Sequence, residues 1–228
     1  MPPSDDELKK AAAERALELV RPGMLLGLGT GTTSRHFIAG VGRLVAQGVA
    51  LTGLATSRAS ETQAAALGIP LVPELDRRVD LAVDGADEID SSLRLIKGRG
   101  GALFREKLVA EAADQFVVVA DESKLVERLG VGVLPVEVLP FLWRRTAARV
   151  AALGGSWVVR GGEEAPFMTD NGNLVLDVSF TGGGIADPEG LGHELKLITG
   201  VVEHGLFCGL TNGVILAGPG GVRVLGNI

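Results

Sequence analysis

The sequence has few of the features that mark secreted, membrane-spanning or disulfide-bonded proteins. It has a single cysteine, Cys208, which excludes an internal disulfide and fits a reducing compartment. No apolar run approaches the roughly 20 residues that a membrane-spanning helix needs. The first residues are acidic and lack the basic and then apolar pattern of a signal peptide. These absences predict a cytoplasmic protein without a membrane partner.

An excess of positive charge is also missing. The formal net charge at pH 7 is −6, whereas general binding to nucleic acids needs a basic surface. We therefore expect no nucleic-acid partner. The chain can still bind an anionic small molecule, because backbone N–H groups and one or two lysines at a local site attract an anion more strongly than the net charge repels it.

Familiar nucleotide-binding and metal-binding motifs are absent as well. The segment Gly27–Thr33 has Thr32 where a dinucleotide fingerprint needs glycine, and it lacks the Gly-Lys-Ser/Thr of a P-loop. His193 and His204 have no partners at metal-ligand spacing, so no zinc site is expected.

What the first 130 residues do contain is an alternation of short apolar segments with helix-length segments. This alternation indicates right-handed βαβ units and a mostly parallel, Rossmann-like sheet. Ser4 and Glu7 have the spacing of a capping box at the start of the first helix. The predicted strands are 24–28, 51–55, 79–83 and 116–120, and the predicted helices are 4–20, 33–47, 57–67 and 102–113.

The pattern changes after Gly130 to the β-α-β-β-α-β order of a ferredoxin-like unit. Phe167–Thr169 and Leu174–Val178 flank Asp170–Asn173, which predicts a hairpin because Asn-Gly tolerates the positive φ angles of a tight turn. The predicted strands are 133–138, 156–160, 174–178 and 201–207, with helices at 141–153 and 188–197.

The tail from Gly213 to Val224 is predicted to form two short strands that rejoin the first sheet. The sequence therefore predicts two α/β domains. A Rossmann-like catalytic domain comprises residues 1–130 plus 206–228, and an inserted ferredoxin-like α+β domain comprises residues 131–205.

A glycine- and threonine-rich loop, Gly29–Thr33, follows the first predicted strand and opens a helix. Free N–H groups and the positive end of the helix dipole make such a place suitable for a phosphate group. The alternative is a plain turn in which a threonine caps the helix. We favour phosphate binding because of the placement between strand and helix.

Four carboxylates are crowded just after the predicted strand 79–83, at Asp84, Asp87, Glu88 and Asp90. In open α/β sheets, ligands bind outside the carboxyl ends of the strands, and crowded carboxylates in such places are often functional. For Asp84 and Asp87 we favour a functional role over a cap or an Asx-turn. For Glu88 and Asp90 we favour a solvated, structural role.

Three further charged residues lie near this acidic turn. Lys97 precedes Gly98-Arg99-Gly100-Gly101, where the glycines suggest that a ligand approaches the backbone closely; a surface lysine is the alternative. Glu106 lies in the charged triplet 105–107. A functional role and a place on a solvated helix face agree equally well with this triplet. Lys124 follows the strand 116–120 and would stand at the carboxyl edge of the sheet.

These motifs occur in one order: Gly29-Thr30-Gly31-Thr32-Thr33, Asp84-Gly85-Ala86-Asp87-Glu88, Lys97-Gly98-Arg99-Gly100-Gly101, Arg105-Glu106-Lys107 and Ala120-Asp121-Glu122-Ser123-Lys124. Together with Leu134–Val138 and Thr169–Asn173, they closely resemble type A ribose-5-phosphate isomerases. The resemblance covers nearly the whole chain.

The resemblance implies an aldose–ketose isomerase that interconverts ribose 5-phosphate and ribulose 5-phosphate through a cis-enediolate. It implies no metal and no organic cofactor, and a homodimer or homotetramer. It assigns Glu106 as the base and Asp84, Asp87 and Lys97 as the other catalytic residues. The implied substrate-binding residues are Thr30, Gly31, Thr32, Thr33, Gly85, Ala86, Gly98, Arg99, Gly100 and Lys124.

Three other functions are alternatives to sugar-phosphate isomerisation. An amino-sugar phosphate deaminase would need an ammonia-handling site, and a CoA transferase would need a nucleotide-sized pocket. A non-catalytic sugar-phosphate sensor usually carries a DNA-binding helix-turn-helix, and only about 23 residues precede the first predicted strand.

Overall fold

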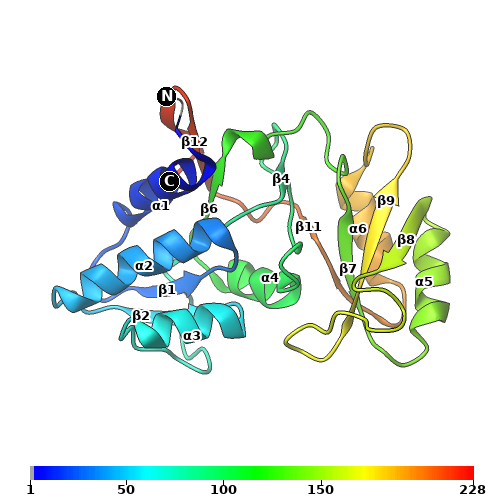
Figure 1. Cartoon of the computed structure of the whole chain (residues 1–228), viewed down its shortest axis with the longest axis horizontal. Coiled ribbons are helices and arrows are strands. Elements are labelled where there is room, and N and C mark those ends of the chain that lie inside the picture. Colours follow the sequence, from blue (N-terminus) through cyan, green and yellow to red (C-terminus); the bar gives the residue numbers. More distant parts are fainter. Residues whose placement is uncertain (1–2) are drawn as a thin grey trace. The chain divides into compact units, whose positions relative to one another are not determined.

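The computed structural model describes residues 3–228, and the chain divides into two compact units (Figure 1). The first unit contains the residues up to 86 together with 105–124 and 210–228, and the second contains 87–104 and 125–209. Residues 87–104, 125–130 and 206–209 therefore group with the second unit, whereas the predicted domain ranges assign them to the first.

The first unit is built on a six-stranded sheet with the order β13-β12-β6-β3-β1-β2. All neighbouring strands run parallel except β12 and β13, which form an antiparallel hairpin at one edge. The predicted mostly parallel sheet and the return of the tail to it are confirmed. The strands are β1 (Leu25–Leu28), β2 (Thr52–Ala55), β3 (Leu81–Asp84), β6 (Phe116–Asp121), β12 (Gly213–Gly218) and β13 (Gly221–Gly226).

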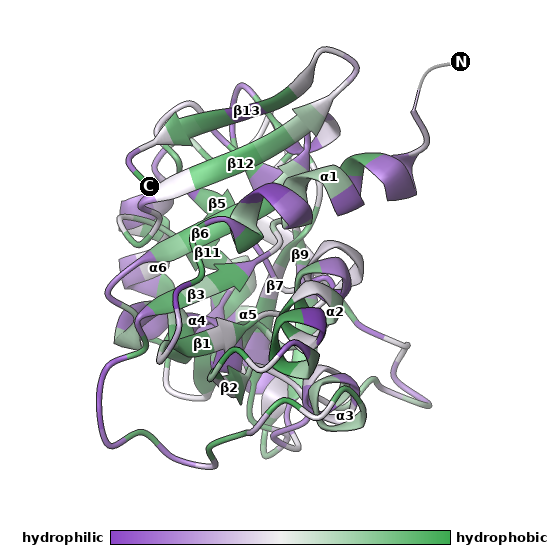
Figure 2. Cartoon of the chain, turned by 90° about the vertical axis from the view of Figure 1, so that its left-hand side faces the viewer, coloured by the Kyte–Doolittle hydropathy of each residue, from purple (hydrophilic) through white to green (hydrophobic). Residues whose placement is uncertain are grey.

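Helices cover both faces of this sheet. Alternate residues of a strand point to opposite faces, so Leu26 and Leu28 pack into a core with α1 and α2, whereas Gly27 faces α4. A Cβ added at Gly27 would lie 2.6 Å from the Val109 side chain, so glycine lets α4 approach β1 closely. The buried strands β3 and β6 are coloured hydrophobic in Figure 2. The helices are α1 (Asp5–Leu17), α2 (Thr32–Ala46), α3 (Arg58–Ala66) and α4 (Leu103–Ala112).

The start of α1 follows its sequence signal. Ser4 is the N-cap, and the Ser4 and Glu7 side chains form the predicted capping box. The hydrogen bonds from the Ser4 backbone and hydroxyl hold the pKa of Glu7 below its ordinary value. The helix ends at Leu17, three residues before the predicted end.

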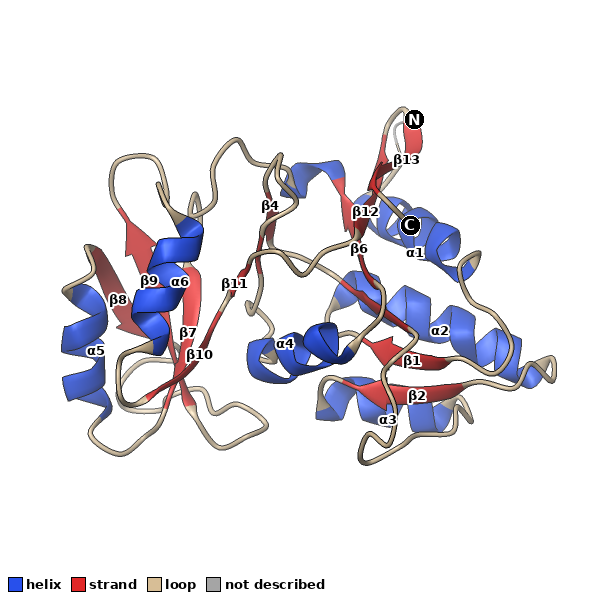
Figure 3. Ribbon diagram, turned by 180° about the vertical axis from the view of Figure 1, so that it is seen from behind, coloured by secondary structure: helices blue, strands red, loops and turns tan. Residues whose placement is uncertain are grey.

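The second unit contains a four-stranded antiparallel sheet with the order β10-β7-β9-β8. Numbered along this unit, the strand order is 4-1-3-2, and α5 and α6 pack against the same side of the sheet around a shared core (Figure 3). The predicted ferredoxin-like unit is confirmed. Its elements are β7 (Leu134–Val138), α5 (Trp143–Ala151), β8 (Gly155–Val159), β9 (Leu174–Phe180), α6 (Pro188–Lys196) and β10 (Val201–His204).

A third, three-stranded sheet in the second unit is not predicted from the sequence. It has the order β11-β5-β4 and consists of β4 (Glu88–Ile89), β5 (Leu95–Ile96) and β11 (Leu206–Phe207). The predicted strand 201–207 is therefore two strands in different sheets, divided at Gly205. A side chain at position 205 would overlap the carbonyl oxygen of Lys97, which explains the glycine there.

The predicted hairpin around Asn171-Gly172 is only partly confirmed. Gly172 has the expected positive φ of 78°, and its N–H donates to the carbonyl of Thr169 at 2.9 Å. The segment Phe167–Thr169, however, contributes a single bridge from Met168 to Leu174 rather than a strand. The strands that pair with β9 along its length are β7 and β8. Within residues 3–228, no helix has the length and apolar character that crossing a membrane requires.

Glu88 is a buried carboxylate that ties β4 to the segment before β7. Its side chain is 3% exposed, and its two oxygens accept the N–H groups of Gly130 and Gly132, both at 2.6 Å. Such bonds are strong because the acceptor is charged. They explain why residues 87–104 belong to the second unit.

We expect Glu88→Gln to destabilise the protein by about 1–3 kcal/mol, because the amide group of glutamine would face a backbone N–H and leave a buried donor without an acceptor. At roughly 2–4 °C per kcal/mol for a chain of this size, the melting temperature falls by about 2–12 °C. Glu189→Gln is the control, since Glu189 forms an exposed ion pair with Arg94. Equal melting temperatures for both variants would contradict the structural role of Glu88.

Candidate active site

The carboxyl edge of the first sheet collects polar residues from three neighbouring strands. The strand order reverses at β1, with β2 on one side and β3 on the other, which is the place where open α/β sheets bind ligands. The loop Gly29–Thr33 (the Gly–Thr loop) follows β1, and Asp84 ends β3. Lys124 ends a short 3-10 turn, η1 (Glu122–Lys124), directly after β6.

Asp84 anchors the Gly–Thr loop. Its side chain is 2% exposed, and its Oδ1 accepts the N–H of Thr30 at 2.9 Å, the hydroxyl of Ser34 at 3.0 Å and the N–H of Gly85 at 2.7 Å. A Cβ at Gly29 would overlap the Asp84 carboxyl group. Glycine at position 29 is therefore required for the carboxylate to lie against the loop.

The amino end of α2 lacks a side-chain cap. Its N-cap is Gly31, with a φ of 108° and no side-chain hydrogen bond, and an added Cβ there would meet no atom within 4 Å. The N–H groups of Thr32 and Thr33 donate to no residue that the structure describes. Thus the alternative of a threonine cap is wrong, and the open helix end suits an anion.

The hydroxyl of Thr30 faces the protein rather than the open helix end. Its Oγ1 lies 2.7 Å from the hydroxyl of Thr56 and 2.8 Å from that of Ser57, both at the end of β2. Ser60 extends this cluster and donates to the carbonyl of Gly29 at 2.6 Å. The sequence contains one signal for this cluster, the hydroxyl residues Thr56 and Ser57 directly after a strand. A contact between Thr30 and substrate stays a prediction.

Glu106 lies on the inner face of α4. It is 5% exposed, so a solvated helix face is the wrong interpretation for this residue. It lines a small pocket together with Gly29, Thr56 and Asp84. The close approach of α4 to the sheet, which Gly27 permits, brings the two carboxylates into one pocket.

The remaining predicted catalytic residues belong to the second unit. Lys97 directly follows β5, is 3% exposed and has its Nζ 5.6 Å from the centroid of the Phe207 ring. Its N–H donates to the carbonyl of Gly205 at 2.9 Å. The alternative of a surface lysine is therefore wrong. A cation held over an aromatic face in this way is stabilised by the ring's negative quadrupole.

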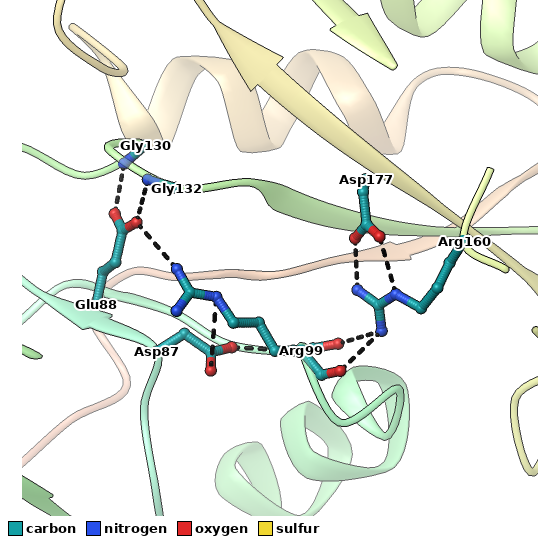
Figure 4. A network of polar contacts seen from close by, with 8 residues as sticks. Asp87, Glu88, Arg99, Gly130, Gly132, Arg160 and Asp177 are labelled. Carbon is teal, nitrogen blue, oxygen red and sulfur yellow. Dashed lines mark hydrogen bonds and ion pairs between the residues drawn. The ribbon is translucent and has the colours of Figure 1, made fainter. Parts of the chain in front are cut away.

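Asp87 is joined to the segment 97–101 (the Lys97 loop). Its N–H donates to the carbonyl of Ile96 at 2.8 Å, and its Oδ2 accepts the N–H of Arg99 at 2.9 Å (Figure 4). The Arg99 side chain is partly exposed, with its Nη2 3.6 Å from Glu88. Gly98 and Gly101 have positive φ angles of 108° and 78°, which glycine adopts without strain.

Glu88 and Asp90 were predicted to be solvated, and this is wrong. Both are buried. The Asp90 carboxylate accepts the N–H groups of Ser92 and Arg94 and the Nε of Arg94 at 2.7 Å. This hydrogen bond to Asp90 raises the pKa of Arg94 above its ordinary value. Asp84 and Asp90 therefore have separate donors, whereas Asp87 and Glu88 both interact with Arg99.

The other predicted contact residues flank these groups. Gly85 and Ala86 are half-buried between Asp84 and Asp87, and Thr33 is buried. The exposed members are Gly31, Thr32, Arg99 and Gly100, whereas Lys124 is half-buried.

Comparison with known proteins agrees with this fold. The family model for ribose 5-phosphate isomerase A (phosphoriboisomerase A) matches residues 52–221. The ribose-5-phosphate isomerase A of Bradyrhizobium diazoefficiens is 48% identical over 96% of this chain and 95% of its own length. The structure of ribose 5-phosphate isomerase A from Methanocaldococcus jannaschii is 40% identical, covers 98% of this chain and 100% of its own, and superposes with a TM-score of 0.92.

A further solved structure, a D-ribose-5-phosphate isomerase in complex with phospho-erythronic acid, is 37% identical with a TM-score of 0.93 over 99% of this chain and 100% of its own. The α/β fold and these relatives define an isomerase of sugar phosphates. The chain belongs to the ribose 5-phosphate isomerase A family, and ribose 5-phosphate isomerisation is favoured over a sensor, a deaminase or a transferase.

We expect Gly29→Ala to lower kcat/KM by about 10- to 100-fold, because the added methyl group must displace the Asp84 carboxylate and shifts of about 1 Å at such sites have effects of this size. Gly220→Ala is the control, since an added Cβ there meets no atom within 4 Å. Steady-state kinetics of both variants checks this. Unchanged turnover in Gly29→Ala would show that the fit of Gly29 against Asp84 is not needed.

Proposed function

We propose that this chain interconverts D-ribose 5-phosphate and D-ribulose 5-phosphate through a cis-enediolate, with Glu106 as the base. The observation that carries the proposal is that two buried carboxylates, Glu106 and Asp84, line the same narrow space between α4 and the sheet. Membership of the isomerase family supports the choice of substrate.

The reaction moves one proton between neighbouring carbons. Glu106 removes the proton from C2 of the open-chain aldose, and the same proton returns at C1 to give the ketose. Carbon acids are weak, so the step needs a positioned base; general base catalysis supplies about 10²–10⁴-fold. The burial of Glu106 and its place on a helix restrict the orientations of its carboxylate.

The enediolate also needs stabilisation at its oxygens. Lys97 supplies the positive charge for the developing oxyanion, and its burial strengthens this interaction because little water screens it. Asp84 and Asp87 open the sugar ring and move protons at O1 and O2. The two aspartates are held by backbone N–H groups, which fixes their orientation.

The phosphate binds at the amino end of α2. Gly31, Thr32 and Thr33 offer N–H groups and hydroxyls there, and the helix dipole favours an anion. Lys124 adds a positive charge after β6. The other substrate contacts are Thr30, Gly85, Ala86, Gly98, Arg99 and Gly100.

We further propose the setting of this activity. The enzyme works without a metal or organic cofactor, in the non-oxidative pentose phosphate pathway of the cytoplasm, and as a homodimer or homotetramer. Its partner is the sugar phosphate, with no nucleic acid and no membrane. The net charge of −6 supports the absence of a nucleic-acid partner, and the single cysteine supports a reducing compartment.

The central experiment assays Glu106→Gln with ribose 5-phosphate in the presence of a chelator. Turnover falls by about 10²–10⁴-fold because the amide cannot accept the C2 proton. Binding of phospho-erythronic acid, measured by calorimetry, survives. The control is Glu111→Gln on the exposed side of the same helix. Near-normal turnover in Glu106→Gln would mean that another group is the base, and a wild-type protein inactive with chelator would refute the metal-free reaction.

Two further variants separate chemistry from binding. Lys97→Ala lowers kcat by about 10²-fold or more, because it removes charge that acts on the transition state. Thr33→Ala mainly raises KM, because it removes a contact made equally in the ground state and the transition state. Thr62→Ala, on the exposed part of α3, is the control for Thr33. If Lys97→Ala mainly raised KM and Thr33→Ala mainly lowered kcat, the residues assigned to the chemical step and those assigned to substrate binding would have to be exchanged.

A further inference from the structure

Arg160 lies beside the Lys97 loop and is not among the residues proposed to contact the substrate. It directly follows β8, where its backbone N–H donates to the carbonyl of Val175 and its carbonyl accepts the N–H of Phe167. Both ends of its backbone are therefore tied to the β8–β9 hairpin. The side chain starts from a rigid element rather than from a mobile loop.

Asp177 fixes the guanidinium group of Arg160. Its two carboxylate oxygens accept the Nη2 at 2.5 Å and the Nε at 3.0 Å, a two-point ion pair (Figure 4). Asp177 lies within β9, and both side chains are 16% exposed. A bidentate pair of this kind has a single geometry, so it leaves the remaining nitrogen, Nη1, pointing in a defined direction.

Nη1 is directed at the backbone of the Lys97 loop. It donates to the carbonyl of Gly98 at 2.9 Å and to the carbonyl of Arg99 at 3.0 Å. The ring of Phe167, which Arg160 covers at 5.7 Å, lies against Gly101, where an added Cβ would come within 2.5 Å of it. The hairpin thus contacts this loop at positions 98, 99 and 101, through two backbone carbonyls and one glycine.

These two carbonyls control the two N–H groups that follow them. A peptide group is planar and trans, so fixing the carbonyl oxygen of one residue fixes the direction of the next N–H. The carbonyl of Gly98 sets the N–H of Arg99, which donates to Asp87. The carbonyl of Arg99 sets the N–H of Gly100, which donates to no residue that the structure describes.

We propose that Arg160, held by Asp177, is a positioning residue that orients and polarises the peptide groups 98–99 and 99–100 for catalysis. One N–H then holds the carboxylate of Asp87, and the other is presented to an oxygen of the sugar phosphate. A positive charge on a carbonyl draws electrons from the amide and makes its N–H a stronger donor. The inference rests on the proposed roles of Asp87 and of the Lys97 loop.

The first test compares Arg160→Ala with Arg144→Ala in steady-state kinetics. Arg144 is the control because it forms an exposed ion pair with Glu163 in the same unit. We expect kcat of Arg160→Ala to fall by about 10- to 100-fold, the size of effect produced by shifts of about 1 Å, while KM changes much less. Arg160→Lys should not restore kcat, because one ammonium group cannot hold both Asp177 and the two carbonyls.

The second test is chemical rescue, which a purely structural defect would not show. Guanidinium chloride at non-denaturing millimolar concentration fills the space left in Arg160→Ala and restores kcat several-fold. The same concentration of sodium chloride does not, and neither salt changes Arg144→Ala. Asp177→Ala combined with Arg160→Ala should be no worse than Arg160→Ala alone, because the two residues act in series.

Two results would overturn the proposal: wild-type kcat in Arg160→Ala, or a loss of kcat that guanidinium does not restore. Lys97→Ala is assayed in parallel to separate this failure from that of the proposed function. An inactive Lys97→Ala beside a fully active Arg160→Ala refutes only the role of Arg160. A fully active Lys97→Ala refutes the catalytic assignment of the loop itself.

Discussion

The first unit depends on one buried carboxylate at a strand end. A charge that leaves water must find hydrogen-bond donors, and Asp84 finds them in Thr30, Gly85 and Ser34. These bonds draw the Gly–Thr loop over the end of β3 and open α2 with a glycine in place of a capping side chain. Two glycines make this arrangement possible. Gly29 leaves room for the Asp84 carboxylate, and Gly27 lets α4, which carries Glu106, approach β1 closely.

The acidic turn shows how crowding along a chain differs from crowding in space. Asp84 is bound by its own loop, Asp87 by the N–H of Arg99, and Asp90 by Arg94 and its neighbours. Glu88 reaches a separate pair of backbone amides. Asp84 and Asp90 thus have separate donors, and Asp87 and Glu88 both interact with Arg99. Carboxylates that are adjacent in the sequence therefore do not form one shared acidic cluster.

Local signals account for most of what could be predicted. The capping box at Ser4, the Asn-Gly turn at 171–172 and the alternation of strands and helices are properties of short segments, so the sequence reveals them. The order of motifs pointed to the family.

The third sheet was missed because β4, β5 and β11 have two residues each, and no periodicity is visible over two residues. The contacts of Arg160 with the Lys97 loop were missed for another reason. They join residues about 60 positions apart, and no short-range pattern encodes such a pair. The burial of Glu88 and Asp90 also depends on the fold around them rather than on local sequence.

The open amino end of α2 has a consequence for acidity. From Gly29 to Ser34, every side chain is either absent or a hydroxyl, so this part of the loop has no group that gains or loses a proton near neutral pH. A phosphate monoester has its second ionisation near pH 6. With the phosphate bound at this helix end as proposed, the second ionisation of the anion would dominate how its contact with this part of the loop varies with pH.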